Sequence, residues 1–196
     1  MRRPALQLGF TLLELMLTLT IAGIVAGIGI PAMRTMMLNN RLTGVSNDLL
    51  ASLQHAREEA LKLQTNVVVC SSPDSTAAVP TCGNGNGGWI VFQDLNGNYQ
   101  VDANETILER HQALDATMFV RADGQAVQFN PSGFATPPGV VVPLRNIVFC
   151  DSRGVVQSGA KSTARGVVVS TTGRARVVSS VADVNAALAV IGGTCP

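Results

Sequence analysis

The chain has 196 residues and a formal net charge of +1, and only 14% of its residues are charged. Gly, Ser, Thr, Asn and Val are plentiful, a composition that is typical of β-rich domains with many turns and that excludes intrinsic disorder. Once the apolar N-terminal portion is set aside, about 150 residues remain, enough for one compact domain with its own core.

The first predicted element is an apolar segment with a single charge. Between Phe10 and Met33 the only charged residue is Glu14. As a helix this segment would extend about 36 Å, which is enough to cross a hydrocarbon layer of about 30 Å. Arg2 and Arg3 precede it and predict a cytoplasmic N-terminus, with the rest of the chain beyond the membrane. A cleaved secretory signal peptide is the alternative.

Glu14 favours an anchor that is kept. A carboxylate about one turn into an apolar segment costs ~1–3 kcal/mol unless it snorkels or pairs, which makes it a functional candidate. If the chain were cut between Gly9 and Phe10, the new α-amino group of one subunit could pair with Glu14 of another. Neutralisation of the two charges would then set the register of packed helices.

The stretch GFTLLELM, with basic residues upstream, resembles the type III signal of type IV pilins and type II secretion pseudopilins. The resemblance implies that a prepilin peptidase cuts after Gly9 and methylates Phe10, and that Glu14 is the glutamate needed for filament assembly. Pro31 fits the same resemblance, since a proline at about this depth permits local melting of the helix inside the filament. The alternative is a simple bend, because proline removes one helical hydrogen bond.

After Arg34, apolar residues recur at steps of three and four, which predicts that the helix continues to about residue 63 with one buried face. The residues of that face are Leu42, Val45, Leu49, Leu53, Ala56, Ala60 and Leu63. The expected division of the chain is a leader over 1–9, a transmembrane and assembly segment over 10–37, and a globular domain over 38–196 that includes the second half of the helix.

From Asn66 onward the period shortens to that of strands, and turn-rich pieces such as GNGNGG, DLNGN, NPSG and TTG separate the apolar runs. The predicted strands are Val67–Ser71, Trp89–Gln93, Thr106–Arg110, Thr117–Arg121, Ala126–Asn130, Ile147–Asp151, Gly166–Ser170 and Arg174–Ser179. Short strands after one long helix predict an α+β fold, with a mostly antiparallel sheet packed on the amphipathic half of the helix. The resemblance to type IV pilins implies that this is a type IV pilin-like fold. The strand order stays open.

Four cysteines, an even number downstream of a membrane segment, favour disulfide bonds in an oxidising compartment. Of the three possible pairings we favour Cys70 with Cys82, which closes a short Pro/Gly/Asn-rich loop, and Cys150 with Cys195, which ties down the C-terminal region. A metal site is the alternative, but no CxxC motif occurs and neither histidine lies near a cysteine in sequence. We therefore expect disulfides and no metal.

Residues 94–105, DLNGNYQVDANE, contain polar side chains at the spacings of a calcium-binding loop: Asp94, Asn96, Asn98, Asp102 and Glu105. An EF-hand loop would have a glycine at position 99, where this chain has a tyrosine, and the flanks do not resemble two helices. Asp, Asn and Gly between strands also suit a tight hairpin turn, which we favour over a calcium site.

The sequence contains no recognisable catalytic arrangement. His55 lies on the predicted helix and His111 follows a strand, and neither belongs to a motif with a nucleophile. The glycines do not form a phosphate-binding GxxxxGK[ST] loop. We expect neither enzymatic activity nor a cofactor.

Charge is unevenly distributed along the predicted domain. Residues 48–144 contain ten acidic and four basic residues, whereas residues 145–177 contain six basic residues and one acidic residue, Asp151. The six basic residues are Arg145, Arg153, Lys161, Arg165, Arg174 and Arg176. A basic surface is therefore expected in the last third of a nearly neutral protein.

Within that part, residues 167–178, VVVSTTGRARVV, predict a strand, a turn and a second strand, with Gly173 able to adopt positive φ. Arg174 and Arg176 would point to the same face about 7 Å apart, and two guanidinium groups could then hold neighbouring phosphates. The alternative is a solvated edge strand whose arginines discourage edge-to-edge pairing. Weaker candidates, if the fold brings them close, are Lys161, Arg165 and Arg153.

Three stretches, WIVFQDLNGNYQVDANE, FNPSGFAT and VVVSTTGRARV, together resemble the GspH/FimT group of minor pilins, and this resemblance covers nearly the whole chain. In the FimT branch a C-terminal GRxR motif binds DNA during natural transformation, and residues 173–176 match it. GspH-type and FimU-type relatives end in similar hairpins, so the branch stays open. Phe149 is the only aromatic residue in 145–177, which argues against base stacking and predicts contacts mainly to phosphates.

These features predict a minor type IV pilin that assembles into a pilus or at its tip and binds extracellular DNA in natural transformation. The alternative is a structural minor pilin or type II secretion pseudopilin that primes filament assembly without binding DNA. The expected partners are other major and minor pilins, the prepilin peptidase and double-stranded DNA. The expected location is the bacterial inner membrane, crossed once with the N-terminus cytoplasmic, and then the periplasm or the extracellular pilus.

Overall fold

The computed structural model describes residues 10–83, 85–136 and 145–196. The chain divides into two compact units, residues 1–38 and 39–196. Helix α1 (Leu12–Leu63) supplies the helical part of the first unit and continues into the second. The helix ends at the predicted position, where Gln64 adopts a positive φ of 54° and donates a hydrogen bond from Nε2 to the Leu61 carbonyl at 2.6 Å.

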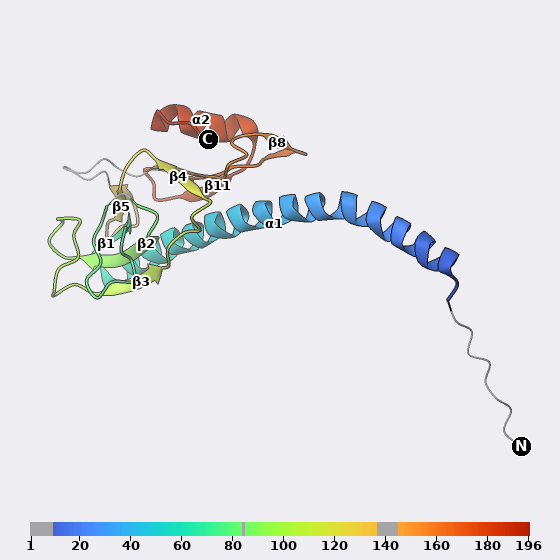
Figure 1. The fold of residues 1–196 in the computed structure, drawn as a ribbon. Coiled ribbons are helices and arrows are strands. Elements are labelled where there is room, and N and C mark those ends of the chain that lie inside the picture. Colours follow the sequence, from blue (N-terminus) through green and yellow to red (C-terminus); the bar gives the residue numbers. More distant parts are fainter. Residues whose placement is uncertain (1–9, 84, 137–144) are drawn as a thin grey trace, which may run out of the picture. The chain divides into compact units, whose positions relative to one another are not determined.

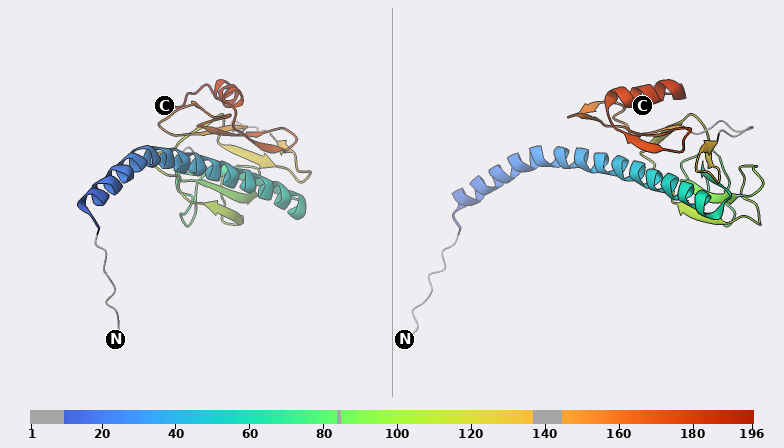
Figure 2. Two further views of the ribbon diagram at one scale, coloured as in Figure 1. Left: turned by 90° about the vertical axis from the view of Figure 1, so that its right-hand side faces the viewer. Right: turned by 180° about the vertical axis from the view of Figure 1, so that it is seen from behind.

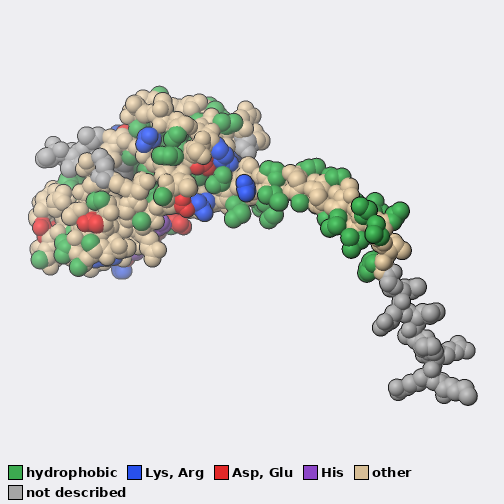
Figure 3. Space-filling model, viewed as in Figure 1, with side chains coloured by type: hydrophobic (Ala, Val, Ile, Leu, Met, Phe, Trp, Pro, Cys, Tyr) green, Lys and Arg blue, Asp and Glu red, His purple; other side chains and the backbone are tan. Residues whose placement is uncertain are grey.

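The first unit is an apolar helix whose large side chains are exposed, and Figure 3 shows them along one face. In the part of the chain that the structure describes, α1 is the one helix long and apolar enough to cross a membrane. Pro31 lies inside it and offers no N–H to the preceding turn, and the Thr35 hydroxyl donates to the Pro31 carbonyl at 3.2 Å. These features agree with the apolar segment expected from the sequence.

In the second unit, one face of α1 is buried along its length. Its buried residues are Leu42, Ser46, Leu49, Ser52, Leu53, Ala56 and Ala60. Val45 packs partly buried against the same core, whereas Leu63 is 39% exposed and does not belong to the buried face. The periodicity is lost at Leu63 because the helix ends there and its last turn is open to solvent.

Two antiparallel sheets and a short ribbon follow α1 (Figures 1 and 2). The five-stranded sheet has the order β3 (Ile107–His111), β2 (Trp89–Asp94), β1 (Asn66–Ser71), β5 (Ala126–Phe129), β6 (Ala135–Thr136). The four-stranded sheet has the order β11 (Ala175–Val178), β10 (Arg165–Val169), β7 (Asn146–Cys150), β4 (Phe119–Ala122). The ribbon pairs β8 (Gln157–Ser158) with β9 (Lys161–Ser162). All eight predicted strands are confirmed within two residues, but they form two sheets where the sequence predicted one.

Both sheets share one core with α1, and alternation along each strand shows how. In β1, Val67 and Val69 join the core that contains the buried face of α1, while Val68 faces a separate cluster on the other side of the sheet. In β7, Phe149 faces the α1 core and Val148 faces α2 (Val181–Ile191). The four-stranded sheet is therefore covered on one face by α1 and on the other by α2.

Helix α2 was not predicted from the sequence. Its N-cap is Ser180, whose hydroxyl accepts a hydrogen bond from the Asp183 N–H, and its C-cap is Gly192 in the left-handed conformation, φ 70°. Val184 and Leu188 are buried against the four-stranded sheet. The second sheet thus obtains a cover over the face that α1 does not reach.

The cysteines form the two bonds that the sequence favoured. Cys70 pairs with Cys82, with 5.6 Å between their Cα atoms, and Cys150 pairs with Cys195 at 5.9 Å. The first bond ties the loop after β1 to that strand. The second ties the segment after α2 to β7 in the middle of the four-stranded sheet.

A polar cluster fastens α1 to the edge of the five-stranded sheet. The Ser52 hydroxyl on α1 donates to a Glu109 carboxylate oxygen and accepts from the Trp89 indole N–H at 2.9 Å. The indole also stacks on the His111 ring, with 3.6 Å between centroids. His55 Nδ1 lies 3.3 Å from the second Glu109 oxygen, so the edge strand β3 and its neighbour β2 are both joined to the helix by directional contacts.

Candidate nucleic-acid interface

The N-terminal candidate residues lie on the first unit. Phe10 is 84% exposed, and Glu14 lies in the first turn of α1, where its N–H donates to the Thr11 hydroxyl at 3.2 Å. A carboxylate in the first turn is favoured by the positive end of the helix dipole. Gly9 and the two arginines before it lie outside the described residues.

The basic hairpin forms as predicted. β10 and β11 pair antiparallel through Val169 and Ala175, and Gly173 has φ 76°. The Ser170 side chain organises the turn, since its hydroxyl oxygen accepts from the Arg174 N–H at 3.1 Å while the Gly173 N–H donates to the Ser170 carbonyl at 2.9 Å. The turn is thus defined by its own hydrogen bonds.

The hairpin turn is packed against a second turn, residues 130–134. The Gly133 carbonyl accepts from Arg57 Nε of α1 at 2.9 Å, and the Ala135 N–H donates to the Thr171 carbonyl at 3.1 Å. A Cβ added to Gly173 would lie 2.2 Å from the Gly133 oxygen. Position 173 therefore requires glycine, because the backbone φ is positive there and because a side chain would collide with the Gly133 carbonyl.

Arg174 and Arg176 are both exposed, while the alternate residues Ala175 and Val177 pack against the α1 core. Arg176 is opposite Val168, on the same face as Val178, which α2 covers. The helix leaves the arginine end of that face open. Within the described residues, the structure gives neither guanidinium group an ion-pair partner, so both charges are free to hold a ligand.

A hollow of about 560 Å³ lies beside the turn, between the hairpin and the last turns of α1. It is lined by Leu53, Gln54, Arg57, Glu58, Leu61, Gly173, Arg174 and Ala175. Two of these residues are basic and one is acidic, so the lining has a net positive charge. Exposed Thr171 in the turn adds a hydroxyl donor of the kind that contacts phosphate oxygens, whereas the Thr172 hydroxyl lies 2.8 Å from the Ser170 hydroxyl and is bonded to it.

Arg153 and Arg165 do not belong to this surface. Arg165 is 6% exposed, and its guanidinium donates to the Ser162 and Ala164 carbonyls and to the Thr43 hydroxyl of α1. Burial lowers the pKa of the Arg165 side chain, and the charge of neighbouring Arg153 lowers that pKa further. Thr43 precedes Arg57 by fourteen residues on α1, about 21 Å along the axis, so Arg165 lies far from the hairpin turn.

Arg153 is committed to its own neighbours. It pairs with Asp151 at 2.6 Å and donates to the Asn39 side chain at 2.9 Å. Burial raises the pKa of Asp151, but the hydrogen bonds and charge of Arg153 outweigh it, so that pKa lies below its usual value. Lys161 is exposed on β9, where Ser162 bonds to Ser179 beyond the far end of β11. The three weaker candidates are thus not gathered around the turn.

Sequence reasoning missed three side chains that the fold brings to this surface. Arg57 and Glu58 lie on the predicted helix but outside its predicted apolar face, and Phe134 lies in the FNPSGFAT stretch and is 51% exposed. No local signal marks them, because they reach the hairpin from α1 and from the other sheet. That Phe149 is the only aromatic residue within 145–177 therefore does not describe the folded surface.

The 94–105 segment forms a turn whose carboxylates accept backbone N–H groups. Asp94 is buried and accepts from Gly97, Asn98 and Tyr99, and Glu105 accepts from the Leu95 and Asp102 N–H groups. Tyr99 has φ 61°, where an EF-hand would place glycine. Burial raises the pKa of the Tyr99 hydroxyl, and the nearby Asp94 charge contributes. Within the described residues, no group of three potential metal ligands comes together.

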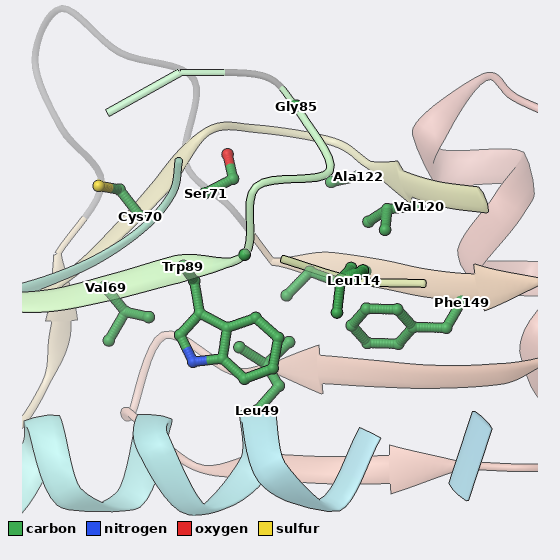
Figure 4. Close-up of a pocket in the computed structure, with 12 residues that line it drawn as sticks. Leu49, Val69, Cys70, Ser71, Gly85, Trp89, Leu114, Val120, Ala122 and Phe149 are labelled. Atoms are coloured by element: carbon green, nitrogen blue, oxygen red, sulfur yellow. The ribbon is translucent and has the colours of Figure 1, made fainter. Parts of the chain in front are cut away.

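A small apolar cavity of about 50 Å³ lies in the shared core (Figure 4). Side chains from α1 and both sheets line it, among them Leu49, Trp89 and Phe149. Its described lining contains no titratable side chain, since Cys70 is bonded to Cys82. The cavity is a packing feature of the core and offers no chemistry.

Comparison with known proteins identifies the family. The family described as "Type II transport protein GspH" matches residues 45–173, and the "Prokaryotic N-terminal methylation motif" matches residues 5–30. The chain belongs to the GspH family. The first match covers α1 from Val45 onward and both sheets through the hairpin turn, and the second covers most of the apolar segment, with Phe10 and Glu14.

Curated relatives of this GspH-family chain are pilins. The type IV major alpha-pilin of Moraxella bovis is 28% identical over 152 residues, which is 65% of this chain and 96% of that protein. The pilin-like protein PilA1 of Thermus thermophilus is 28% identical over 176 residues, which is 86% of this chain and 97% of that protein. The GspH-family chain is thus a pilin-like structural protein of the minor pilin and pseudopilin kind.

Among solved structures, the GspH-family chain is similar to the type IV minor pilin FimU of Pseudomonas aeruginosa. The TM-score is 0.48 at 20% identity, and the match covers 71% of this chain and 89% of that chain. A second crystal form of FimU matches with a TM-score of 0.44 at 19% identity. The methylation motif of this GspH-family chain implies processing by a prepilin peptidase, and its pilin relatives imply assembly with other pilins.

Proposed function

We propose that this minor pilin binds extracellular double-stranded DNA, without sequence preference, through the hairpin turn. The observation that carries the proposal is that Arg174 and Arg176 are both exposed and have no ion-pair partner among the described residues, on a hairpin whose turn two sets of hydrogen bonds hold in place. Two such groups about 7 Å apart suit phosphates along a backbone. Arg57 adds a third positive charge from α1, and it supports the turn through Gly133. The proposed role is in natural transformation.

The test is a titration of the full chain in uncharged detergent micelles with labelled duplex DNA at several salt concentrations. Each phosphate contact contributes about 0.9 to the slope of log affinity against log salt. Arg174→Ala combined with Arg176→Ala should therefore weaken binding and lower the magnitude of that slope by about 2. An unchanged affinity, or binding that does not respond to salt, would reject the proposal.

A matched control separates site from net charge. Arg41→Ala combined with Lys161→Ala also removes two exposed positive charges, but neither residue lies at the hairpin turn. This control should leave the salt slope nearly unchanged. If both double variants weaken binding equally, the binding is a general effect of charge and the hairpin is not a site.

A structural role is the second candidate, and the family match favours it directly. In this alternative the chain primes filament assembly of a pilus or secretion pseudopilus, and the arginines contact neighbouring pilins. Two measurements separate the candidates. If the role is only structural, the unaltered chain does not bind duplex DNA, and the arginine double variant is incorporated into filaments less than the unaltered chain.

The division of the chain follows from the same proposal. We propose a leader over residues 1–9 that is cut before Phe10, an assembly segment over 10–37 that crosses the inner membrane once with its N-terminus cytoplasmic, and a globular domain over 38–196 in the periplasm or filament. The N-terminal motif and the exposed apolar helix support it. We further propose that the protein has no enzymatic activity, in keeping with its structural family.

A further inference from the structure

An aromatic side chain is exposed beside the basic turn. Phe134 is 51% exposed, whereas Trp89, Phe129 and Phe149 are at most 4% exposed. The other aromatic residues described in the globular unit are buried or half-buried. A single exposed apolar residue needs no explanation by itself. Its position and its rigid backbone make Phe134 different.

The backbone of Phe134 is held on both sides. Its N–H donates to the Asn130 side-chain oxygen at 3.0 Å, and its carbonyl accepts from the Asn130 N–H at 3.0 Å. This pair of bonds closes the 130–134 turn around Phe134. The ring is therefore presented from a fixed point, with little backbone entropy left to lose when it contacts a ligand.

Both neighbours of Phe134 in the chain contact the hairpin turn. Gly133 packs against Gly173, and Ala135 bonds to Thr171. Consecutive Cα atoms are about 3.8 Å apart, so the Phe134 backbone lies one residue away from each of these two contacts with residues 171–173. Arg57, which donates to the Gly133 carbonyl, adds a positive charge beside the backbone of the turn that carries Phe134.

Such a surface distinguishes single-stranded from double-stranded DNA. In a duplex the base faces are stacked on one another, so a protein ring beside the phosphates has no base to contact. In a single strand each base has a free face, and aromatic side chains next to a positive track are the usual stacking platforms. The ring therefore adds affinity only for the unpaired strand.

We propose that Phe134 is a base-stacking residue that lets the hairpin surface bind single-stranded DNA, with Arg174 and Arg176 holding the adjacent phosphates. The inference rests on the proposed function, because it needs the arginines as the phosphate contacts. It differs from that function in the ligand, since duplex binding requires only the charges.

The test compares a labelled oligothymidylate, which forms no pairs, with a labelled duplex of the same length, using the full chain in uncharged detergent micelles. Phe134→Ala should weaken binding of the single strand by about 5- to 150-fold, the loss expected for one base–aromatic stack. Duplex affinity should change by less than about twofold. Phe134→Trp should retain or strengthen single-strand binding, and Phe134→Leu, which keeps apolar bulk without a ring, should lose most of it.

The outcomes separate the two proposals. Stacking would be overturned if Phe134→Ala bound the single strand and the duplex as tightly as the unaltered chain does. It would also be overturned if Phe134→Ala lost affinity for the two ligands equally, or if Phe134→Leu bound the single strand as tightly as the unaltered chain does. If Phe134→Ala changed only filament incorporation, the residue would be a pilin contact and stacking would again be overturned. The proposed function fails instead if the arginine double variant keeps its duplex affinity, whatever Phe134 does.

Discussion

Glu58 is the one acidic residue among the described residues that line the hollow at the hairpin turn, and it faces the same space as Arg174. An exposed carboxylate near a phosphate-binding site repels the ligand, and solvent and salt weaken that repulsion. Its presence shows that the surface is not optimised for charge alone. If the arginines bind DNA as we propose, this single residue moderates their affinity.

Replacing Glu58 by Gln should raise affinity for duplex DNA by about twofold at low salt, because exposed charge interactions are worth up to ~1 kcal/mol. The gain should shrink as salt is added. Titration of the full chain at two salt concentrations measures it. Asp48→Asn is the matched control, since Asp48 lies ten residues earlier on α1, about 15 Å away. A loss of affinity in Glu58→Gln would show that the carboxylate supports the turn.

At the scale of elements, the sequence predicts those that carry a local signal. The strands were found because their alternation and turn residues are local, and the buried face of α1 was found because its period is regular. Helix α2 was missed although Ser180 and Asp183 form an N-cap and Gly192 a C-cap, because its Ala- and Val-rich stretch has no strong polar face. β6, β8 and β9 have two residues each, too few to show a period.

The candidate surface was predicted only in part for a related reason. Arg174 and Arg176 share one short hairpin, so strand geometry alone places them on one face. Arg57 and Phe134 reach that hairpin through contacts between different elements, and no spacing in the chain encodes such a meeting. The same limit explains why Arg153 and Arg165 looked available: their burial depends on α1, which lies far away in sequence.

The disulfide bonds also belong to the scale of elements, because each secures a different one. In the chain-entropy account a bond that spans 45 residues, Cys150–Cys195, stabilises by about 4 kcal/mol, and one that spans 12, Cys70–Cys82, by about 3. Cys150→Ala with Cys195→Ala should therefore reduce the free energy of unfolding more than Cys70→Ala with Cys82→Ala.

The first double variant should also release α2 locally. Hydrogen exchange followed by mass spectrometry should show faster exchange in the α2 peptide, with β1 unchanged, whereas the second variant should leave α2 protected. Equal exchange of α2 in both variants would mean that Val184 and Leu188 hold the helix without the bond.

At the scale of the whole molecule, we propose that the first unit decides whether the subunit joins a filament. Its large apolar side chains are exposed and its one carboxylate is Glu14. Outside a membrane such a surface is stable only against other helices of the same kind. A charge in that setting requires a partner, and the α-amino group of a processed neighbour is the partner we propose.

Glu14→Ala should therefore leave membrane insertion intact but reduce incorporation into filaments by about tenfold or more, the change that corresponds to a loss of about 1.4 kcal/mol or more per subunit. Immunoblots of sheared filaments and of membrane fractions measure both quantities. Glu14→Gln, which keeps the shape but not the charge, should behave like Glu14→Ala. Normal incorporation of either variant would reject the pairing.

Trp89, the only tryptophan of the chain, stands where helix and sheet meet. Its indole N–H is bonded to Ser52 of α1, and its ring is stacked on His111 of β3. The tryptophan fluorescence of the protein therefore reports on one contact between α1 and the five-stranded sheet. Any event that separates the helix from the sheet, whether heating, polymerisation or ligand binding, should change the emission wavelength and intensity of Trp89 without any added label.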